Sequence, residues 1–430
     1  MASSKLPLQD RSARALSALR ALPAKARAAR ADHRARHTPS GFTFLLGERI
    51  AHMPAAWDAL TASESICLQR PFLETLEAAG PEGMRTHYAL VADGEGRPLA
   101  AVACQSLQLD GAALPSKAAP SRAKETRDRA LSKVHQRILV CGNLLGWGPQ
   151  AVAFAPEADR AAVWPGILEA LYRIRRADGL FGETGLVMVK DLDEGLWADG
   201  DAALQRFSYR PFETEPNMIL RFQPGWRTFE DYLGAMKSDY RSGLRKQIRE
   251  VEEAGLVLER LDAAGVATHA AELHRLYHEV HDRQKMRLVS ISPAWLPALA
   301  ARFGTDFVVT VIRRPGDPKL LGFISTLKDR DGAIGYYIGF DKAEASGGTP
   351  LYLRLLYALV EDALALGATW ASLGRTALEP KAKLGAEGQP LRCYLRHRVP
   401  ALNTVVQGLL RVLPEPAQPP KRSPFKPAKA

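Results

Sequence analysis

The apolar and polar positions along the chain repeat one order of predicted elements twice. Short apolar segments flanked by turn residues predict strands, and apolar residues that recur every three or four positions predict helices. In the second half the order is hairpin, strand, helix and strand, at residues 306–327, 335–340, 350–366 and 369–373. In the first half the same order occurs at residues 86–107, 137–141, 159–178 and 185–189. The repetition predicts two α/β lobes with a cleft between them, where ligand sites are common.

A loop of small residues, 343–348, joins the predicted strand to the predicted helix of the second half. Thr349 is predicted to cap this helix, with Pro350 at its first position. Such a helix start leaves backbone N–H groups free beside the positive end of the helix dipole, which suits a pyrophosphate. The alternative is that Gly347 and Gly348 only turn the chain. The loop matches neither the dinucleotide-binding nor the P-loop glycine pattern.

A second chemical signal lies in the connecting segment 226–255. Cationic side chains recur every four residues along one face of its predicted helix, at Lys237, Arg241, Arg245 and Arg249. Lys246 lies beside this row. Guanidinium groups bind phosphate oxygens in pairs, so the row suits a phosphate-bearing ligand. The alternative is a solvated helix face, balanced by the acidic residues that follow it.

These segments carry a resemblance to a known family. The order of strand, small-residue loop, helix and strand from GYYIGF to TWASL resembles the acyl-CoA-binding core of the GNAT superfamily. With RTALEPKAKLGA and SDYRSGLRKQIRE, the chain is similar to the two-lobed branch related to Fem-type aminoacyl transferases, in which K-x-x-[LF]-G follows the last core strand. The resemblance spans most of residues 40–410. It implies an α/β fold with a mixed sheet, built as tandem GNAT-like acyl-CoA N-acyltransferase lobes.

The resemblance also implies direct transfer of an acyl group from acyl-CoA, such as acetyl-CoA, to an amine. This reaction needs a base, backbone donors for the carbonyl oxygen and an acid for the leaving group, but no covalent nucleophile. The expected catalytic groups are a proton donor, a base and a cation that steadies developing charge, namely Tyr336 (or Tyr337), Asp341 or Glu379, and Lys381. The expected acyl-CoA-binding groups are glycines and cations, namely Arg241, Arg245, Lys246, Gly339, Gly347, Gly348 and Arg375.

Charge and composition refine the domain boundaries. Of the net charge of +11, residues 1–38 contribute +7 (nine Lys or Arg, two Asp) and residues 414–430 contribute +3 (four Lys or Arg, one Glu), which leaves about +1 for the body. The predicted parts are a basic disordered tail, an N-terminal lobe with a basic loop at 110–136, a C-terminal acyltransferase lobe and a basic Pro-rich tail, at 1–38, 39–222, 223–413 and 414–430. Neither tail has a core-forming pattern, so we expect both to be dispensable for folding.

Other patterns narrow the function class. The four cysteines are far apart, and His278 and His281 have no further ligands at a suitable spacing, so we expect neither a disulfide framework nor a metal. No apolar run approaches the roughly 20 residues that span a bilayer, and we expect a cytoplasmic protein without a transmembrane segment. An amphipathic segment at 399–413 is predicted to dock on the body, with binding to a membrane surface as the alternative.

The sequence leaves the acceptor open between a small molecule and a cell-envelope precursor that carries an amine. One alternative is an aminoacyl-tRNA-dependent, Fem-like transferase that acts on such a precursor. Another is a catalytically silent protein that binds an anionic or membrane surface through its basic tails.

Overall fold

Two mixed β-sheets organise the chain. The computed structural model describes residues 40–110, 135–177, 180, 183–282, 288–411 and 415–427, and residues 43–430 form one unit. The predicted basic tail 1–38 and most of the basic loop 110–136 lie outside the described residues. The first sheet has the order β1-β2-β3-β4-β6-β15-β7, with β5 paired to β3, and the second has the order β9-β10-β11-β12-β13-β8-β14.

The strand bounds show where each half of the chain contributes. The first sheet contains β1 (Thr43–Gly47), β2 (Arg85–Ala92), β3 (Pro98–Asp110), β4 (His135–Cys141), β5 (Val152–Phe154), β6 (Thr184–Leu192), β7 (Arg210–Glu213) and β15 (Arg392–His397). The second contains β8 (Asn217–Arg221), β9 (Val257–Leu261), β10 (Phe307–Arg313), β11 (Leu320–Asp329), β12 (Gly332–Phe340), β13 (Trp370–Ser372) and β14 (Glu387–Gln389). The predicted repeat is present in both sheets, because β4 pairs parallel with β6 and β12 pairs parallel with β13.

The two lobes exchange one strand each. Strand β8 belongs to the first half of the chain but lies between β13 and β14 of the second sheet. Strand β15 belongs to the second half but lies between β6 and β7 of the first sheet. The predicted boundary at residues 222 and 223 therefore does not separate two independent lobes. Since each sheet is completed by the other half, we expect the lobes to fold together.

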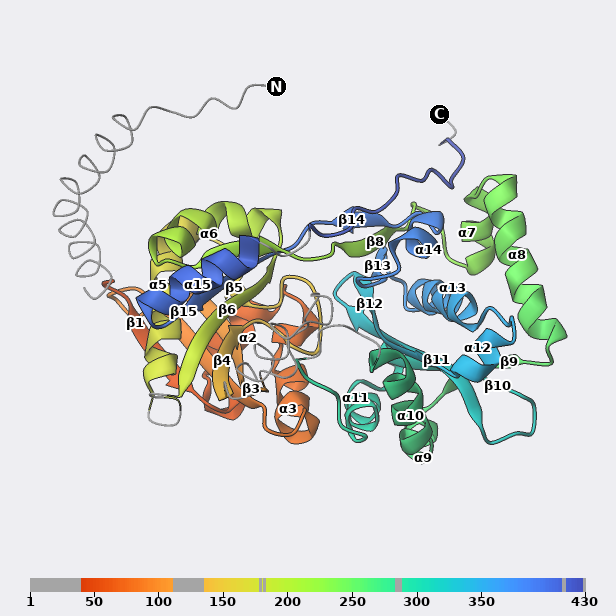
Figure 1. Cartoon of the computed structure of the whole chain (residues 1–430), viewed down its shortest axis with the longest axis horizontal. Helices are drawn as coiled ribbons and strands as arrows, with labels where there is room; N and C mark the ends of the chain where they lie inside the picture. Colours follow the sequence, from red (N-terminus) through yellow and green to blue (C-terminus); the bar gives the residue numbers. More distant parts are fainter. Residues whose placement is uncertain are drawn as a thin grey trace, which may run out of the picture. The chain divides into compact units, whose positions relative to one another are not determined.

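Helices cover both faces of each sheet (Figure 1). They are α2 (Ala55–Thr61), α3 (Arg70–Ala79), α5 (Arg160–Arg176), α6 (Glu194–Arg206), α7 (Phe229–Ala235), α8 (Ser238–Glu253), α9 (Ala263–Thr268), α10 (Ala270–His281), α11 (Trp295–Phe303), α12 (Lys342–Ser346), α13 (Leu351–Ala365), α14 (Leu378–Lys383) and α15 (Pro400–Arg411). Helix α13 packs on one face of the second sheet and α10 on the other. Helices α3 and α11 join the lobes, since the rings of Phe72 and Trp295 lie 5.7 Å apart edge to face.

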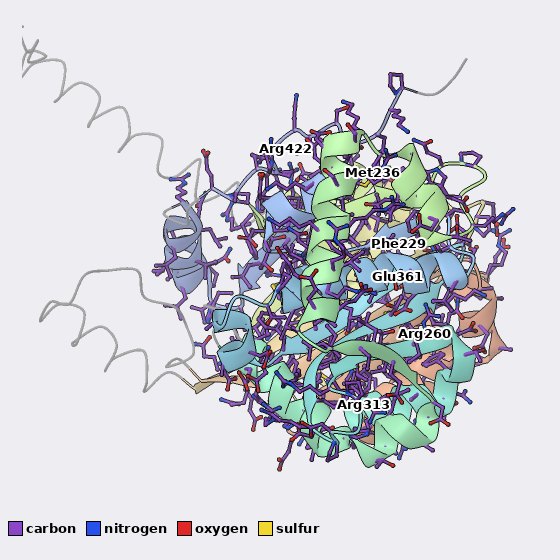
Figure 2. All side chains as sticks on the ribbon, turned by 90° about the vertical axis from the view of Figure 1, so that its right-hand side faces the viewer. Phe229, Met236, Arg260, Arg313, Glu361 and Arg422 are labelled. Carbon is purple, nitrogen blue, oxygen red and sulfur yellow. The ribbon has the colours of Figure 1, made fainter. Side chains whose placement is uncertain are left out.

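The C-terminal segment differs from its prediction, because residues 415–427 are part of the folded body. The Phe425 ring lies 5.0 Å from Trp226 and 5.7 Å from Tyr232. The backbone N–H of Lys237 donates to Pro424 O (2.8 Å), and that of Lys426 to Ala235 O (3.0 Å). Figure 2 looks onto this side of the molecule. The basic, Pro-rich composition gave no sign of the half-buried Phe425 that anchors the segment, and we now expect removal of the segment to lower stability.

Three local predictions are corrected. Helix α13 begins at Leu351, and Thr349 makes no capping bond to it. The small-residue loop 343–348 is mostly the short helix α12, because the Asp341 carboxylate accepts bonds from the Ala343 and Glu344 N–H groups. The polar loop predicted after β13 contains helix α14. Of the three corrections, the one at α12 has a visible side-chain cause, the cap by Asp341.

Candidate functional site

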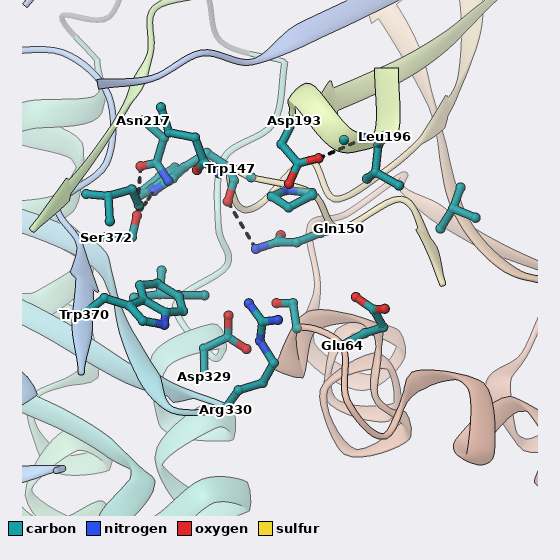
Figure 3. Close-up of a pocket in the computed structure, with 18 of the residues that line it drawn as sticks. Glu64, Trp147, Gln150, Asp193, Leu196, Asn217, Asp329, Arg330, Trp370 and Ser372 are labelled. Atoms are coloured by element: carbon teal, nitrogen blue, oxygen red, sulfur yellow. Dashed lines mark hydrogen bonds between the residues drawn. The ribbon is translucent and has the colours of Figure 1, made fainter. Parts of the chain in front are cut away.

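A cavity of about 540 Å³ lies between the two sheets (Figure 3). Its charged lining consists of three carboxylates and three guanidinium groups, from Glu64, Asp193, Asp329, Arg160, Arg221 and Arg330. Uncharged polar and aromatic groups complete it, among them Trp147, Gln150, Asn217, Trp370 and Ser372. Because residues from both halves line the cavity, it is the cleft that the two-lobed pattern predicts.

Two carboxyl groups of the cavity have a raised pKa. Burial raises the pKa of Asp329, although its Oδ1 accepts a bond from the Ile66 N–H (2.7 Å). Burial also raises the pKa of Glu64, and Arg330 opposes that change in part. The third carboxylate, Asp193, caps α6 by accepting a bond from the Leu196 N–H (3.1 Å). Raised carboxyl pKa values in a cleft are typical of general bases that work near neutral pH.

The cavity reaches the point where the parallel strands β12 and β13 separate. These strands pair only at Ala333 with Ala371 and at Ile334 with Ser372, although β12 continues to Phe340. On the other edge of β12, Ser325 of β11 lies opposite two residues, Tyr336 and Tyr337, which is a β-bulge. Ile334 and Ser372 both line the cavity. The cavity therefore lies directly beside the gap between the two strands.

A loop from the first lobe, residues 142–150, lies against this gap. The Trp147 indole N–H donates to Ser372 Oγ (3.2 Å), and the Tyr337 hydroxyl donates to Leu145 O (3.0 Å). Gly374 leaves room for Trp147, since a Cβ there would lie 2.8 Å from the indole. Side-chain bonds from Gln105 and Asn143 fix the loop. Trp147 thus stands where the cavity meets the strand gap.

A buried ionic cluster holds the two lobes together behind the cavity. Asp191, fully buried and at positive φ (59°), contacts the side chains of Lys190 and Arg375. Burial would raise the pKa of Asp191, but these two cations together lower it. Lys190 Nζ also donates to Gly146 O (2.8 Å) in the Trp147 loop. The cluster therefore couples the loop to the segment that follows β13.

Lys381, predicted as a cation that steadies developing charge, is buried beside the backbone of Arg375. Its side chain is 4% exposed, and Nζ donates to Arg375 O (2.5 Å). Burial lowers the pKa of Lys381 to about 7. The lysine of the K-x-x-L-G segment therefore supports the backbone of Arg375 and does not line the cavity. Arg375, predicted to bind the donor, is paired with Asp191 instead.

The other predicted catalytic residues lie apart from the cavity. Tyr336 is 1% exposed in the core between Phe72 and Trp295, and burial raises the pKa of its hydroxyl. Burial would raise the pKa of Asp341, but the N–H groups of α12 and the ammonium of Lys319 (3.1 Å) lower it overall. Glu379 lies on α14 and pairs with Arg422 (2.5 Å). None of these carboxyl or hydroxyl groups lines the cavity.

Three of the predicted donor-binding residues lie on the outer side of α13, away from the cavity. Arg241, Arg245 and Lys246 project from α8, which packs against α13. Arg245 pairs with Glu230 (2.8 Å), and Lys246 with Glu250 (3.8 Å).

The three predicted glycines differ in what surrounds them. Gly347 ends α12, and Gly348 follows at φ 102° with open space around it. Gly339 lets α10 approach β12, since a Cβ there would lie 2.5 Å from the backbone of Leu276.

Sequence reasoning missed the residues that line the cavity. Glu64 and Asp329 are 265 positions apart in the chain, and each stands in an ordinary polar turn sequence. The only available signal was the GNLLGWG segment at 142–148, whose glycines and tryptophan are unusual between strands. The partners of that loop, among them Ser372 and Tyr337, lie in the other lobe, so no spacing along the chain could place them.

Comparison with known proteins indicates which class of protein this chain is similar to. Residues 238–382 match the family described as Acetyltransferase (GNAT) domain. The solved structure of FemX has a TM-score of 0.52 and 11% identity, covering 85% of this chain and 100% of that one. A tandem GNAT protein from the clavulanic acid biosynthesis pathway gives a TM-score of 0.46 and 13% identity, with 84% and 99% covered.

The C-terminal domain of a putative lysylphosphatidylglycerol synthetase from Agrobacterium fabrum gives a TM-score of 0.46 and 12% identity, with 83% and 95% covered. A search of curated protein sequences found no match.

The chain is a two-lobed α/β protein whose residues 238–382 are similar to a GNAT acetyltransferase domain. Its fold is like that of FemX, and the two mixed sheets together with the matched domain bear out the predicted mixed α/β, GNAT-like fold. Within the described residues, no helix is long and apolar enough to cross a membrane.

Proposed function

We propose that the protein is an N-acyltransferase that transfers an acyl group from acyl-CoA to an amine held in the cavity between the lobes. One observation carries the proposal: the cavity contains two carboxyl groups with raised pKa values and meets the gap between β12 and β13. A cationic amine is attracted by carboxylates and must lose a proton before it attacks. The matched GNAT domain supports acyl transfer as the reaction class.

The chemistry follows from these positions. Glu64 or Asp329 accepts a proton from the amine, whose nitrogen then forms a bond to the acyl carbonyl carbon. Backbone N–H groups along the unpaired edge of β12 are placed to stabilise the negative oxygen of the intermediate. The C–S bond then breaks, the nitrogen loses its extra proton to give the amide, and the thiolate takes up that proton to leave as the free thiol of CoA. Trp147 lies where the amine in the cavity and the thioester in the strand gap would meet.

The start of α13 is the proposed site for the CoA pyrophosphate. This helix has 15 residues, no side-chain cap and no acid in its first turn. The Leu351 N–H donates to Thr349 O (2.8 Å), but those of Tyr352 and Leu353 remain available to an anion, together with the positive end of the helix dipole. Arg241 on the adjacent α8 remains a candidate for a further phosphate contact.

A charge substitution tests the donor site. In Gly348→Asp, a carboxylate would stand where the pyrophosphate is proposed, and we expect CoA affinity measured by calorimetry to fall at least tenfold. Gly316→Asp is the matched control, because Gly316 also has positive φ and open surroundings but lies in the turn between β10 and β11. Equal CoA affinity in the two variants would contradict the donor site.

The donor class needs a separate assay. Thiol release from a panel of acyl-CoA esters, measured with and without a pool of amines, should show amine-dependent turnover. If thiol release is absent and aminoacyl-tRNA supplies the acyl group instead, the donor in this proposal is wrong while the amine cavity stands.

A further inference from the structure

Helix α15 presents its apolar side chains to the outside. Of the seven large apolar side chains that are exposed in the described part of the chain, four lie in or directly before this helix: Val399 (40%), Leu402 (43%), Val405 (56%) and Leu409 (60%). Leu402, Val405 and Leu409 are spaced by three and four positions, so they share one face. The segment docks on β15 and β7 with Val406 and Leu410 half-buried, but it leaves these three apolar side chains exposed.

A polar residue also anchors the helix. Asn403 is the buried residue of α15, and its Nδ2 donates to Ser208 O (2.9 Å) while its Oδ1 accepts from the His397 N–H (2.9 Å). These bonds orient the helix so that the opposite, apolar face points away from β15 and β7. An exposed apolar face on a fixed helix indicates an interaction surface.

The surroundings of this face are cationic. Residues 390–411 contain four arginines and no acid. Burial and the nearby guanidinium groups of Arg396 and Arg398 lower the pKa of Arg175, which indicates that the three cations lie close together. None of the three forms an ion pair with an acid among the described residues. Such a cluster attracts an anionic partner.

A cavity of about 490 Å³ opens beside the same face, and Val399 and Leu402 form part of its wall. Arg398, Arg137 and His397 also line it, with Glu183 paired to Arg137 (3.2 Å). His397 Nδ1 accepts a bond from the Val399 N–H (3.0 Å), so the neutral ring carries its proton on Nε2. That buried Nε2 has no hydrogen-bond partner among the described groups. The wall of the cavity thus holds an unused donor and a free guanidinium group.

We propose that α15 is a docking surface for an anionic phospholipid bilayer. Leu402, Val405 and Leu409 insert between the lipids, while Arg398 and His397 bind a headgroup phosphate in the adjoining cavity. An apolar helix face flanked by arginine is the pattern of helices that lie in the membrane interface. The surface is distinct from the cavity between the lobes, so the inference does not depend on the proposed reaction.

Vesicle sedimentation of the full-length protein tests the proposal. We expect binding to phosphatidylcholine vesicles that contain phosphatidylglycerol, and much weaker binding to pure phosphatidylcholine. The triple variant Leu402→Glu, Val405→Glu, Leu409→Glu should lose at least about tenfold in partitioning. Val257→Glu is the matched control, because Val257 is similarly exposed (41%) but lies on β9 of the other sheet. Every variant keeps residues 1–38, so their basic side chains contribute equally.

A second pair of variants distinguishes binding at the headgroup site from a general effect of positive charge. Arg398→Ala should weaken binding to phosphatidylglycerol vesicles severalfold, whereas Arg302→Ala, an exposed arginine paired with Glu74 on α3, should not. Equal vesicle binding by the wild type and the triple variant would overturn the proposal. So would a wild-type dimer that the triple variant dissociates without any vesicle binding, because the face would then join two copies. If the protein bound vesicles only after residues 111–134 had been removed, that segment, and not a bilayer, would be the natural occupant of the α15 face.

Discussion

The buried lysine Lys381 gives the sharpest quantitative prediction. Its pKa of about 7, against an ordinary value of 10.5, means that the folded protein releases this proton at a lower pH than the unfolded chain does. Between these two values the unfolded state binds more protons, so the stability of the wild type rises with pH by about 1.4 kcal/mol per pH unit. This gain in stability is absent at pH values below the pKa of Lys381 in the folded protein. It is complete at pH values above its pKa in the unfolded chain.

Lys381→Met keeps the length of the side chain and removes its titration. From roughly pH 6 to roughly pH 9, the wild type should gain about 2.7 kcal/mol in free energy of unfolding relative to this variant. Denaturant unfolding at several pH values measures the difference. Lys383→Met is the control, because Lys383 lies on the same helix but is 55% exposed, and it should parallel the wild type. If the Lys381→Met curve also runs parallel to the wild type, the lysine is not buried as described.

Two further predictions concern packing. Phe425→Ala should lower the free energy of unfolding by about 1–3 kcal/mol, because the half-buried ring anchors the C-terminal segment; an unchanged denaturation midpoint would show that this segment is not packed. Gly339→Ala should cost about 1–3 kcal/mol through the clash with the backbone of Leu276, whereas Gly234→Ala, in open space, should be near neutral. Equal stabilities of these two glycine variants would refute the close approach of α10 to β12.

The elements that the sequence predicts well are those whose local pattern decides them. Strand β12 is a short apolar run before an aspartate, and α13 has apolar residues at helical spacing up to Gly367, so both were found close to their true bounds. The strand exchange was not predictable in this way. β8 and β15 are short strands, β15 with basic residues at half of its positions, and nothing in their sequences says which sheet they join.

The site was harder to predict than the fold, for a physical reason. The proton affinities of Glu64 and Asp329 arise from burial in a cavity made by both halves of the chain. The K-x-x-L-G motif drew attention to Lys381, but its surroundings fix its chemistry. Burial and the bond to the carbonyl of Arg375 make it a support for the backbone instead of a surface cation. Sequence position identifies such residues, while their charge state depends on tertiary contacts.

Amine-dependent thiol release from acyl-CoA by Glu64→Gln is the measurement that tests the central claim most directly. The Glu64 side chain is only partly buried, so the substitution should leave the melting temperature unchanged. With Glu64 as the base, turnover should fall on the order of 10²-fold or more, while Asp306→Asn, an exposed acid paired with Lys328, should keep wild-type turnover. Equal turnover in wild type, Glu64→Gln and Asp329→Asn would contradict the assignment of the cavity between the lobes as the site of acyl transfer.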